Sequence, residues 1–139
     1  MGKRRKSREL ALQVLYQLDV TKQDPSKVLA QFQQQFSPNE EKDEFLEGLV
    51  LGVLDHSQEI DRLIERFSEN WRLERMSIID RNILRMATFE LIYCEDIPPK
   101  VTLNEAIDLG KEYGSEDSGS FINGILDRID KEVVKNNSQ

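Results

Sequence analysis

The sequence is poor in the residues that build disulfide frameworks, zinc sites and membrane spans. Among 139 residues there is one cysteine, Cys94, and one histidine, His56. A single cysteine cannot form an internal disulfide, and a lone histidine without neighbouring cysteines or histidines does not make a zinc site. No apolar run approaches the roughly 20 residues that cross a bilayer. We therefore expect a cytoplasmic protein with no membrane segment, no metal and no cofactor.

Catalytic motifs are missing as well. The sequence has no glycine-rich phosphate loop after a strand, no HExxH and no CxxC. His56 and Ser57 are neighbours, but adjacent helical side chains point in different directions and do not form a nucleophile–base pair. Glu116 and Asp117 have a simpler use, because acids in the first turn of a helix favour its dipole. The sequence thus predicts a protein that is not an enzyme.

Positive charge is scarce except at one end of the chain. There are 19 Lys and Arg against 26 Asp and Glu, a net charge of −7. Five of the cations lie between Lys3 and Arg8, which leaves 14 cations against 26 acids in the rest of the chain. An acidic protein that concentrates its cations favours a polyanion at that place, whereas a basic terminus can also be a solvated tail. Charge alone does not favour a polyanion-binding site over a solvated tail.

Helical periodicity covers the chain, and strand alternation is almost absent. Helix starts are marked at Asp24-Pro25, at Ser37-Pro38-Asn39-Glu40, at Ser77 with Asp80, and at Thr102-Leu103-Asn104-Glu105. Between the starts, apolar residues recur every three or four positions. We expect an all-α fold of seven helices in two small packed helical bundles. The predicted bounds are a single domain over 1–139, with an N-terminal subdomain over 1–70 and a C-terminal subdomain over 71–139.

Two features bear on how the predicted helices pack. Gly48 and Gly52 lie four positions apart in one predicted helix, which indicates a close approach of another helix at both. Trp71 lies in the connection between the two halves. Because apolar helical faces flank it, we expect it to be buried as a core plug rather than to stack on a ligand.

The stretch from Gly114 to Gly124 allows two interpretations. In the first, Ser115 is an N-cap after Gly114, and Phe121 lies in the core. In the second, the hydroxyls, carboxylates and backbone N–H groups form a platform for single-stranded RNA, because phosphates suit helix N-termini and base edges offer donors and acceptors. Asp117 would repel phosphate but can accept a hydrogen bond from a cytosine or guanine edge. The residue pattern leaves both open.

Motifs along the whole chain carry a family resemblance. The first predicted helix contains Arg8-Glu9, Ala11, Gln13 and Leu15-Tyr16, and the middle contains Asp80-Arg81, Ile83-Leu84-Arg85 and Glu90-Leu91. The densest matches are Ile97-Pro98-Pro99-Lys100-Val101, Asn104-Glu105-Ala106-Ile107, Tyr113-Gly114-Ser115-Glu116-Asp117-Ser118 and Phe121-Ile122-Asn123-Gly124-Ile125-Leu126-Asp127. On these motifs the chain resembles the NusB family of bacterial transcription antitermination factors.

The resemblance implies a fold of seven helices in two subdomains and a function in RNA binding. NusB-like proteins bind single-stranded boxA RNA of nascent transcripts together with NusE, which is also a small-subunit ribosomal protein. The pair helps RNA polymerase resist termination, notably in ribosomal RNA operons. The RNA-binding residues implied here are Lys3, Arg4, Arg5, Lys6, Arg8, Gln13, Asp117, Ser118 and Phe121. The implied NusE-facing surface includes Asp80 and Arg85, although Asp80 also fits a capping role.

Two other interpretations remain open at this point. NusB-like folds also occur as non-catalytic RNA-binding accessory domains of RNA cytosine methyltransferases. Some family members form homodimers through the surface that would bind RNA, so a protein-binding, self-associating module is the second alternative.

Overall fold

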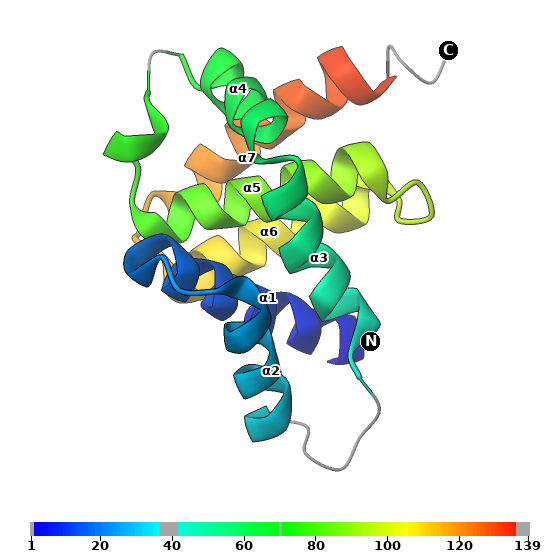
Figure 1. The fold of residues 1–139 in the computed structure, drawn as a ribbon. Coiled ribbons are helices and arrows are strands. Elements are labelled where there is room, and N and C mark those ends of the chain that lie inside the picture. Colours follow the sequence, from blue (N-terminus) through cyan, green and yellow to red (C-terminus); the bar gives the residue numbers. More distant parts are fainter. Residues whose placement is uncertain (1, 37–41, 70, 136–139) are drawn as a thin grey trace.

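The computed structural model describes residues 2–36, 42–69 and 71–135, and almost all of them are helical (Figure 1). A 3-10 turn over Leu73–Arg75 precedes the fifth helix, and a π-helical segment over Asp130–Val134 continues the seventh. The α-helices are α1 (Gly2–Thr21), α2 (Pro25–Phe36), α3 (Glu44–Asp55), α4 (Ser57–Phe67), α5 (Ile78–Tyr93), α6 (Pro99–Tyr113) and α7 (Ser118–Ile129). The prediction of an all-α fold with seven helices is confirmed. The subdomain bounds near residue 70 stay a prediction.

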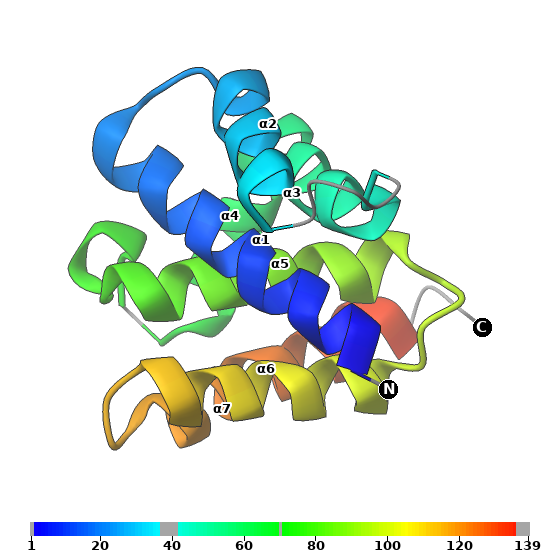
Figure 2. The same cartoon turned by 90° about the horizontal axis from the view of Figure 1, so that it is seen from below.

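Helix α5 lies at the centre of the molecule. It packs against α1, α3, α4, α6 and α7 (Figure 1). The reason is its apolarity on more than one face, which buries Ile83 and Leu84 completely, together with Ile64 from α4 and Leu126 from α7. Seen from below, α1 crosses the centre of the molecule and α6 lies beside it (Figure 2). Helix α5 therefore supplies the centre of a core that α1, α3, α4, α6 and α7 share.

Polar residues at helix starts account for several element boundaries. The Asp24 carboxylate accepts a hydrogen bond from the Ser26 backbone N–H at 3.2 Å, next to Pro25 at the first position of α2. The Ser77 hydroxyl accepts one from the Asp80 N–H at 3.0 Å. Both starts were predicted. The capping box predicted over 37–40 lies outside the described residues, and α3 begins at Glu44 with Asp43 as its N-cap.

The predicted capping box at Thr102 was wrong. Helix α6 begins three residues earlier, at Pro99, because proline at the first helical position sacrifices no intrahelical hydrogen bond. Thr102 is therefore inside the helix and buried, and its hydroxyl donates to Glu90 Oε1 at 3.0 Å. The threonine serves a long-range contact between α6 and α5 rather than a local cap.

The expected burial of Trp71 was also wrong. The indole is 52% exposed. The apolar positions of this connection are filled instead by Leu73 and Met76, both buried. The chain turns outward before the tryptophan, where Glu69 adopts a left-handed backbone conformation with φ of 51°.

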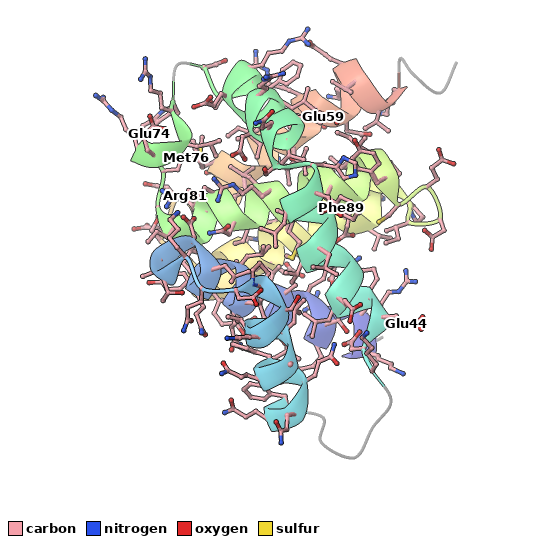
Figure 3. The ribbon with its side chains drawn as sticks, in the orientation of Figure 1. Glu44, Glu59, Glu74, Met76, Arg81 and Phe89 are labelled. Carbon is pink, nitrogen blue, oxygen red and sulfur yellow. The ribbon has the colours of Figure 1, made fainter. Side chains whose placement is uncertain are left out.

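Of the two glycines in α3, only one marks a close approach. A Cβ atom on Gly52 would lie 2.2 Å from the ring of Phe89, which α5 points toward α3 (Figure 3). A Cβ on Gly48 would meet nothing within 4 Å, so the close packing predicted there was wrong. Of the two glycines, Gly52 is therefore the one that the close approach of α5 requires.

Candidate functional site

The basic N-terminal run is part of helix α1 and not a separate tail. The helix begins at Gly2, so all five cations project from its first two turns. Lys3, Arg4 and Lys6 are exposed, and Arg4 lies 3.7 Å from Asp96 and over the ring of Phe45. A helix holds these charges at fixed spacing, which suits a run of phosphates better than a flexible tail does.

Arg5 is shared between solvent and the acids of α6. Its guanidinium pairs with Glu105 and, at 2.7 Å, with Asp108, and half of the side chain remains exposed. The hydrogen bond to Glu105, followed by that to Asp108, raises the pKa of Arg5, so it keeps its charge at any physiological pH. A phosphate would have to compete with these two carboxylates for Arg5.

Arg8 is not presented to a ligand. The residue is 4% exposed, and its Nε and Nη2 donate to the two oxygens of Glu90 at 2.8 and 2.7 Å. Thr102 donates to the same carboxylate, and Glu105 lies 3.4 Å from Arg8 Nη1. Burial opposes the charge, but the bonds to Glu90 outweigh it and raise the pKa of Arg8. Arg8 therefore links α1 to α5 and α6. The prediction that it contacts RNA directly was wrong, because its guanidinium is buried and bound by these acids.

Gln13 lies on the exposed side of α1, at the edge of an apolar groove of about 480 Å³. The groove lies between α1, α2, the start of α5 and the end of α6, and it includes Tyr16, Val20 and Phe32. Tyr16 and Val20 were not among the predicted site residues. The sequence could have indicated them, since positions 13, 16 and 20 lie on one face of the helix, opposite the face that is buried.

Tyr113 connects this groove to the start of α7. Its hydroxyl donates to Glu9 Oε2 at 2.6 Å, which ties the end of α6 to α1. The bond to the Glu9 carboxylate is also the main reason that the pKa of Tyr113 lies well above its ordinary value. Helix α7 begins five residues after Tyr113, so the bond fixes the chain shortly before the α6–α7 turn.

The start of α7 separates its predicted residues into two groups. Ser118 is buried, and its hydroxyl accepts a hydrogen bond from the Ser115 N–H at 2.9 Å, so Ser115 is not the N-cap that the pattern predicted. Gly114 is required here, because a Cβ would lie 2.3 Å from that hydroxyl. Asp117 is exposed at the N-cap position and makes no side-chain cap. Asp117 is therefore available to a ligand, whereas the Ser118 hydroxyl supports the turn.

Phe121 is half-buried in the first turn of α7. Its ring meets the exposed indole of Trp71 at 6.0 Å between centroids, with an angle of 74° between the planes. The interpretation that placed Phe121 wholly in the core is thus incomplete, because one edge of the ring belongs to a surface aromatic pair.

Arg85 belongs to a network of ion pairs centred on Asp19. Arg81 donates to Asp19 at 2.7 and 2.9 Å, and Arg85 approaches the same carboxylate at 3.1 Å while also pairing with Asp61 at 2.9 Å. Figure 3 places Arg81 at the start of α5, and its partner Asp19 lies near the end of α1. The hydrogen bond from Arg81 is the main cause that lowers the pKa of Asp19 to about 2.

The two predicted partner-facing residues differ in their surroundings. Asp80 is buried, and its Oδ1 has no hydrogen-bond partner among the described residues. Arg85 is engaged by two carboxylates, so a partner would meet a guanidinium that is already neutralised. Asp19 and Asp61 were missed because each is distant in sequence from the arginine that it binds.

Other kinds of site find little support in the described ranges. Within them, no group of three His, Cys, Asp or Glu side chains could hold a metal ion. None of the helices described is both long and apolar enough to span a membrane. Cys94 is half-buried, and burial is the main cause that raises the pKa of its thiol, which suits a structural cysteine better than a nucleophile.

Comparison with known proteins places the chain in an all-α class of transcription antitermination proteins. The family model "NusB family" matches residues 5–131. A transcription antitermination protein NusB from Desulfatibacillum aliphaticivorans is 50% identical over 93% of this chain and 90% of its own length. Another, from Syntrophus aciditrophicus, is 50% identical over the whole of this chain and 86% of its own length. The chain belongs to the NusB family.

Solved structures agree with this assignment. A T. maritima NusB structure superposes with a TM-score of 0.85 at 38% identity, covering 96% of this chain and 94% of that one. A structure of the antitermination factors NusB and NusE in complex with double-stranded RNA superposes with a TM-score of 0.83 at 30% identity, covering 94% of this chain and 98% of that one.

Proposed function

We propose that this protein is an RNA-binding transcription antitermination factor that acts by binding and not by catalysis. Together with NusE it binds single-stranded boxA RNA of nascent transcripts, notably of ribosomal RNA operons, and helps RNA polymerase resist termination. The family membership supports this function, as does a solved relative that contains NusE and RNA. The observation that carries it is the set of exposed cations fixed on the first turns of α1 in an otherwise acidic protein.

Different parts of the surface have different tasks in this proposal. Lys3, Arg4 and Lys6 attract phosphates, and Arg5 joins them when RNA displaces Glu105 or Asp108. Gln13, Asp117 and Phe121 lie where bases can be recognised by hydrogen bonds and stacking. Arg8 and Ser118 act indirectly, by fixing α1 and the turn before α7.

The NusE-facing role of Asp80 and Arg85 stays a prediction. In its favour, the unpartnered carboxylate oxygen of Asp80 leaves an acceptor at the start of α5. Because that oxygen is buried, a donor from a partner reaches it only if the start of α5 shifts, and the new hydrogen bond would then offset the cost of burying the oxygen. Arg85 would contribute by orienting the surface through Asp19 and Asp61.

A gel-shift titration with boxA RNA and a scrambled RNA, each with and without NusE, tests the proposal. We expect boxA RNA to bind more tightly when NusE is present and the scrambled RNA to bind more weakly than boxA in both series. Equal binding of the two RNAs in the presence of NusE would overturn specific recognition.

Self-association is a second candidate, because the apolar groove beside Gln13 exposes Tyr16 and Val20. Exposed apolar patches of this kind mark interaction surfaces. Light scattering with and without RNA separates the two candidates. A dimer that RNA does not dissociate would favour self-association, whereas a monomer, or a dimer that RNA dissociates, would favour RNA binding.

A further inference from the structure

The only tryptophan of the sequence, Trp71, lies on the surface beside the predicted RNA-binding residue Phe121. The two rings meet edge to face, with centroids 6.0 Å apart and planes at 74°. Half of the indole is open to solvent. Exposing so much apolar surface costs free energy and indicates an interaction surface.

Backbone contacts hold Trp71 in place from both sides. The buried Ser68 hydroxyl donates to the Trp71 carbonyl at 2.6 Å, and the Trp71 N–H donates to the Ser68 carbonyl at 3.3 Å. Two residues further on, the Leu73 N–H donates to the Glu65 carboxylate at 3.1 Å. A ring on a fixed backbone loses less conformational entropy when a ligand binds.

The indole borders two hollows. One, of about 540 Å³, has Phe121, Ser120 and Gly124 on the α7 side, and a Cβ on Gly124 would meet nothing within 4 Å. The other, of about 490 Å³, lies between Trp71, Glu65 and Glu74. Figure 3 shows Glu74 on the outer side of the connection between α4 and α5. A flat ligand can therefore reach the indole from either side.

Charges around the indole are mixed. Arg128 pairs with Glu69 at 2.8 Å in the first hollow, and Arg72 approaches Glu74 at 3.9 Å in the second. With these pairs and Glu65, the surroundings do not attract phosphate as the start of α1 does. Serine hydroxyls, carboxylates and guanidinium groups instead match the donors and acceptors on base edges.

We propose that Trp71 and Phe121 form a stacking platform for a nucleobase of single-stranded RNA. The platform adjoins Asp117 at the start of α7 and extends the base-recognising surface to the α4–α5 connection. The inference rests on the proposed RNA-binding function, and it assigns to Trp71 a role that the family comparisons leave open. Stacking accepts any base, so the platform contributes affinity more than sequence preference.

Intrinsic fluorescence tests the platform directly, because the chain has a single tryptophan. On titration with boxA RNA in the presence of NusE, we expect RNA to quench the emission of Trp71 and to shield it from acrylamide. Trp71→Ala should weaken RNA binding by roughly 10-fold or more without changing the salt slope, because stacking releases no counterions. Trp71→Phe should retain most of the affinity. Phe36→Ala, which removes another exposed aromatic ring on α2, is the matched control and should bind as the wild type does.

The outcomes separate the platform from the underlying function. If wild-type protein binds boxA RNA while the emission of Trp71 is unchanged and Trp71→Ala binds equally well, the platform is overturned and the function stands. If wild-type protein binds no RNA even with NusE, both the stacking platform and the proposed RNA-binding function are overturned. If Trp71→Ala loses NusE but keeps RNA binding in its absence, the surface belongs to a protein partner. A thermal melt of Trp71→Ala matching that of the wild type shows that lost affinity is not lost folding.

Discussion

Burial separates the five cations at the start of α1 into different roles. Lys3 and Lys6 face solvent and form no ion pair with any described residue, and Arg4 faces solvent beside Asp96. Arg5 is shared with Glu105 and Asp108, and Arg8 is enclosed. The enclosed Arg8–Glu90 pair satisfies both oxygens of the carboxylate with two guanidinium nitrogens and Thr102. A buried pair of this kind tolerates loss of neither partner.

Arg8→Ala should therefore destabilise the protein, since it leaves Glu90 buried without its counter-charge. We expect the free energy of unfolding to fall by about 3–5 kcal/mol. Urea denaturation followed by circular dichroism measures this. Lys6→Ala is the control, and a change within about 0.5 kcal/mol is expected for that exposed position. Unchanged stability of Arg8→Ala together with weakened RNA binding would return Arg8 to the RNA contacts.

Asp19 gives a prediction for the acid side of the pH range. Arg81 and its neighbours lower the pKa of Asp19 from 3.8 to about 2. The resulting stabilisation is present above pH 4 and is lost as the pH falls towards 2, because only the charged form is bound by the arginines. Asp19→Asn should lower the free energy of unfolding by about 2 kcal/mol at pH 7, with the difference from wild type shrinking between pH 4 and 2. A difference that is constant over this window would contradict the assignment.

At the scale of the helices, local rules predicted most starts but not all. Asp24-Pro25 and Ser77 mark true starts because their signals lie within one turn of the boundary. Thr102 fits the same local rule, but the helix start predicted there was wrong. Helix α6 begins earlier, at Pro99, and the Thr102 hydroxyl donates to Glu90 on another helix. Where a polar side chain has a long-range partner, a local pattern cannot show which use prevails.

The contact between α3 and α5 offers a paired test with two glycines on one helix. Gly52→Ala should destabilise the protein by about 1–3 kcal/mol, because the new Cβ would displace the ring of Phe89. Gly48→Ala, which meets open space, should stabilise it by about 0.5–1 kcal/mol through helix propensity. Thermal or urea unfolding of both variants checks the signs.

A second substitution shows whether the clash itself is the cause. Adding Phe89→Leu to Gly52→Ala shortens the ring that obstructs the Cβ and should recover part of the lost stability. If Gly52→Ala were as stable as Gly48→Ala, the close approach of α5 to α3 would be refuted.

At the scale of the whole molecule, the arrangement of the helices follows from the sequence only in part. Apolar periodicity and the family resemblance predicted the seven helices, and the structure adds that α5 lies at their centre. The contacts that shape the site join residues far apart in the chain, such as Arg8 with Glu90 and Asp19 with Arg81. Trp71 was misplaced for the same reason, because Leu73 and Met76 compete for the core positions of that connection.

The charge distribution of the whole molecule underlies its proposed function. With 26 acids against 19 cations, most of the surface should repel RNA, and the densest run of cations lies at the start of α1. This makes binding there dependent on salt, because each phosphate contact releases counterions.

The most direct test is the salt dependence of boxA RNA binding, with NusE present, for Lys3→Ala/Lys6→Ala. The control is Lys27→Ala/Arg62→Ala, which removes equal charge from exposed positions on α2 and α4. Two lost phosphate contacts should weaken binding and reduce the slope of log affinity against log salt by about 1.5 units, whereas the control should keep the wild-type slope. Equal slopes for the two double variants would contradict an RNA site at the start of α1.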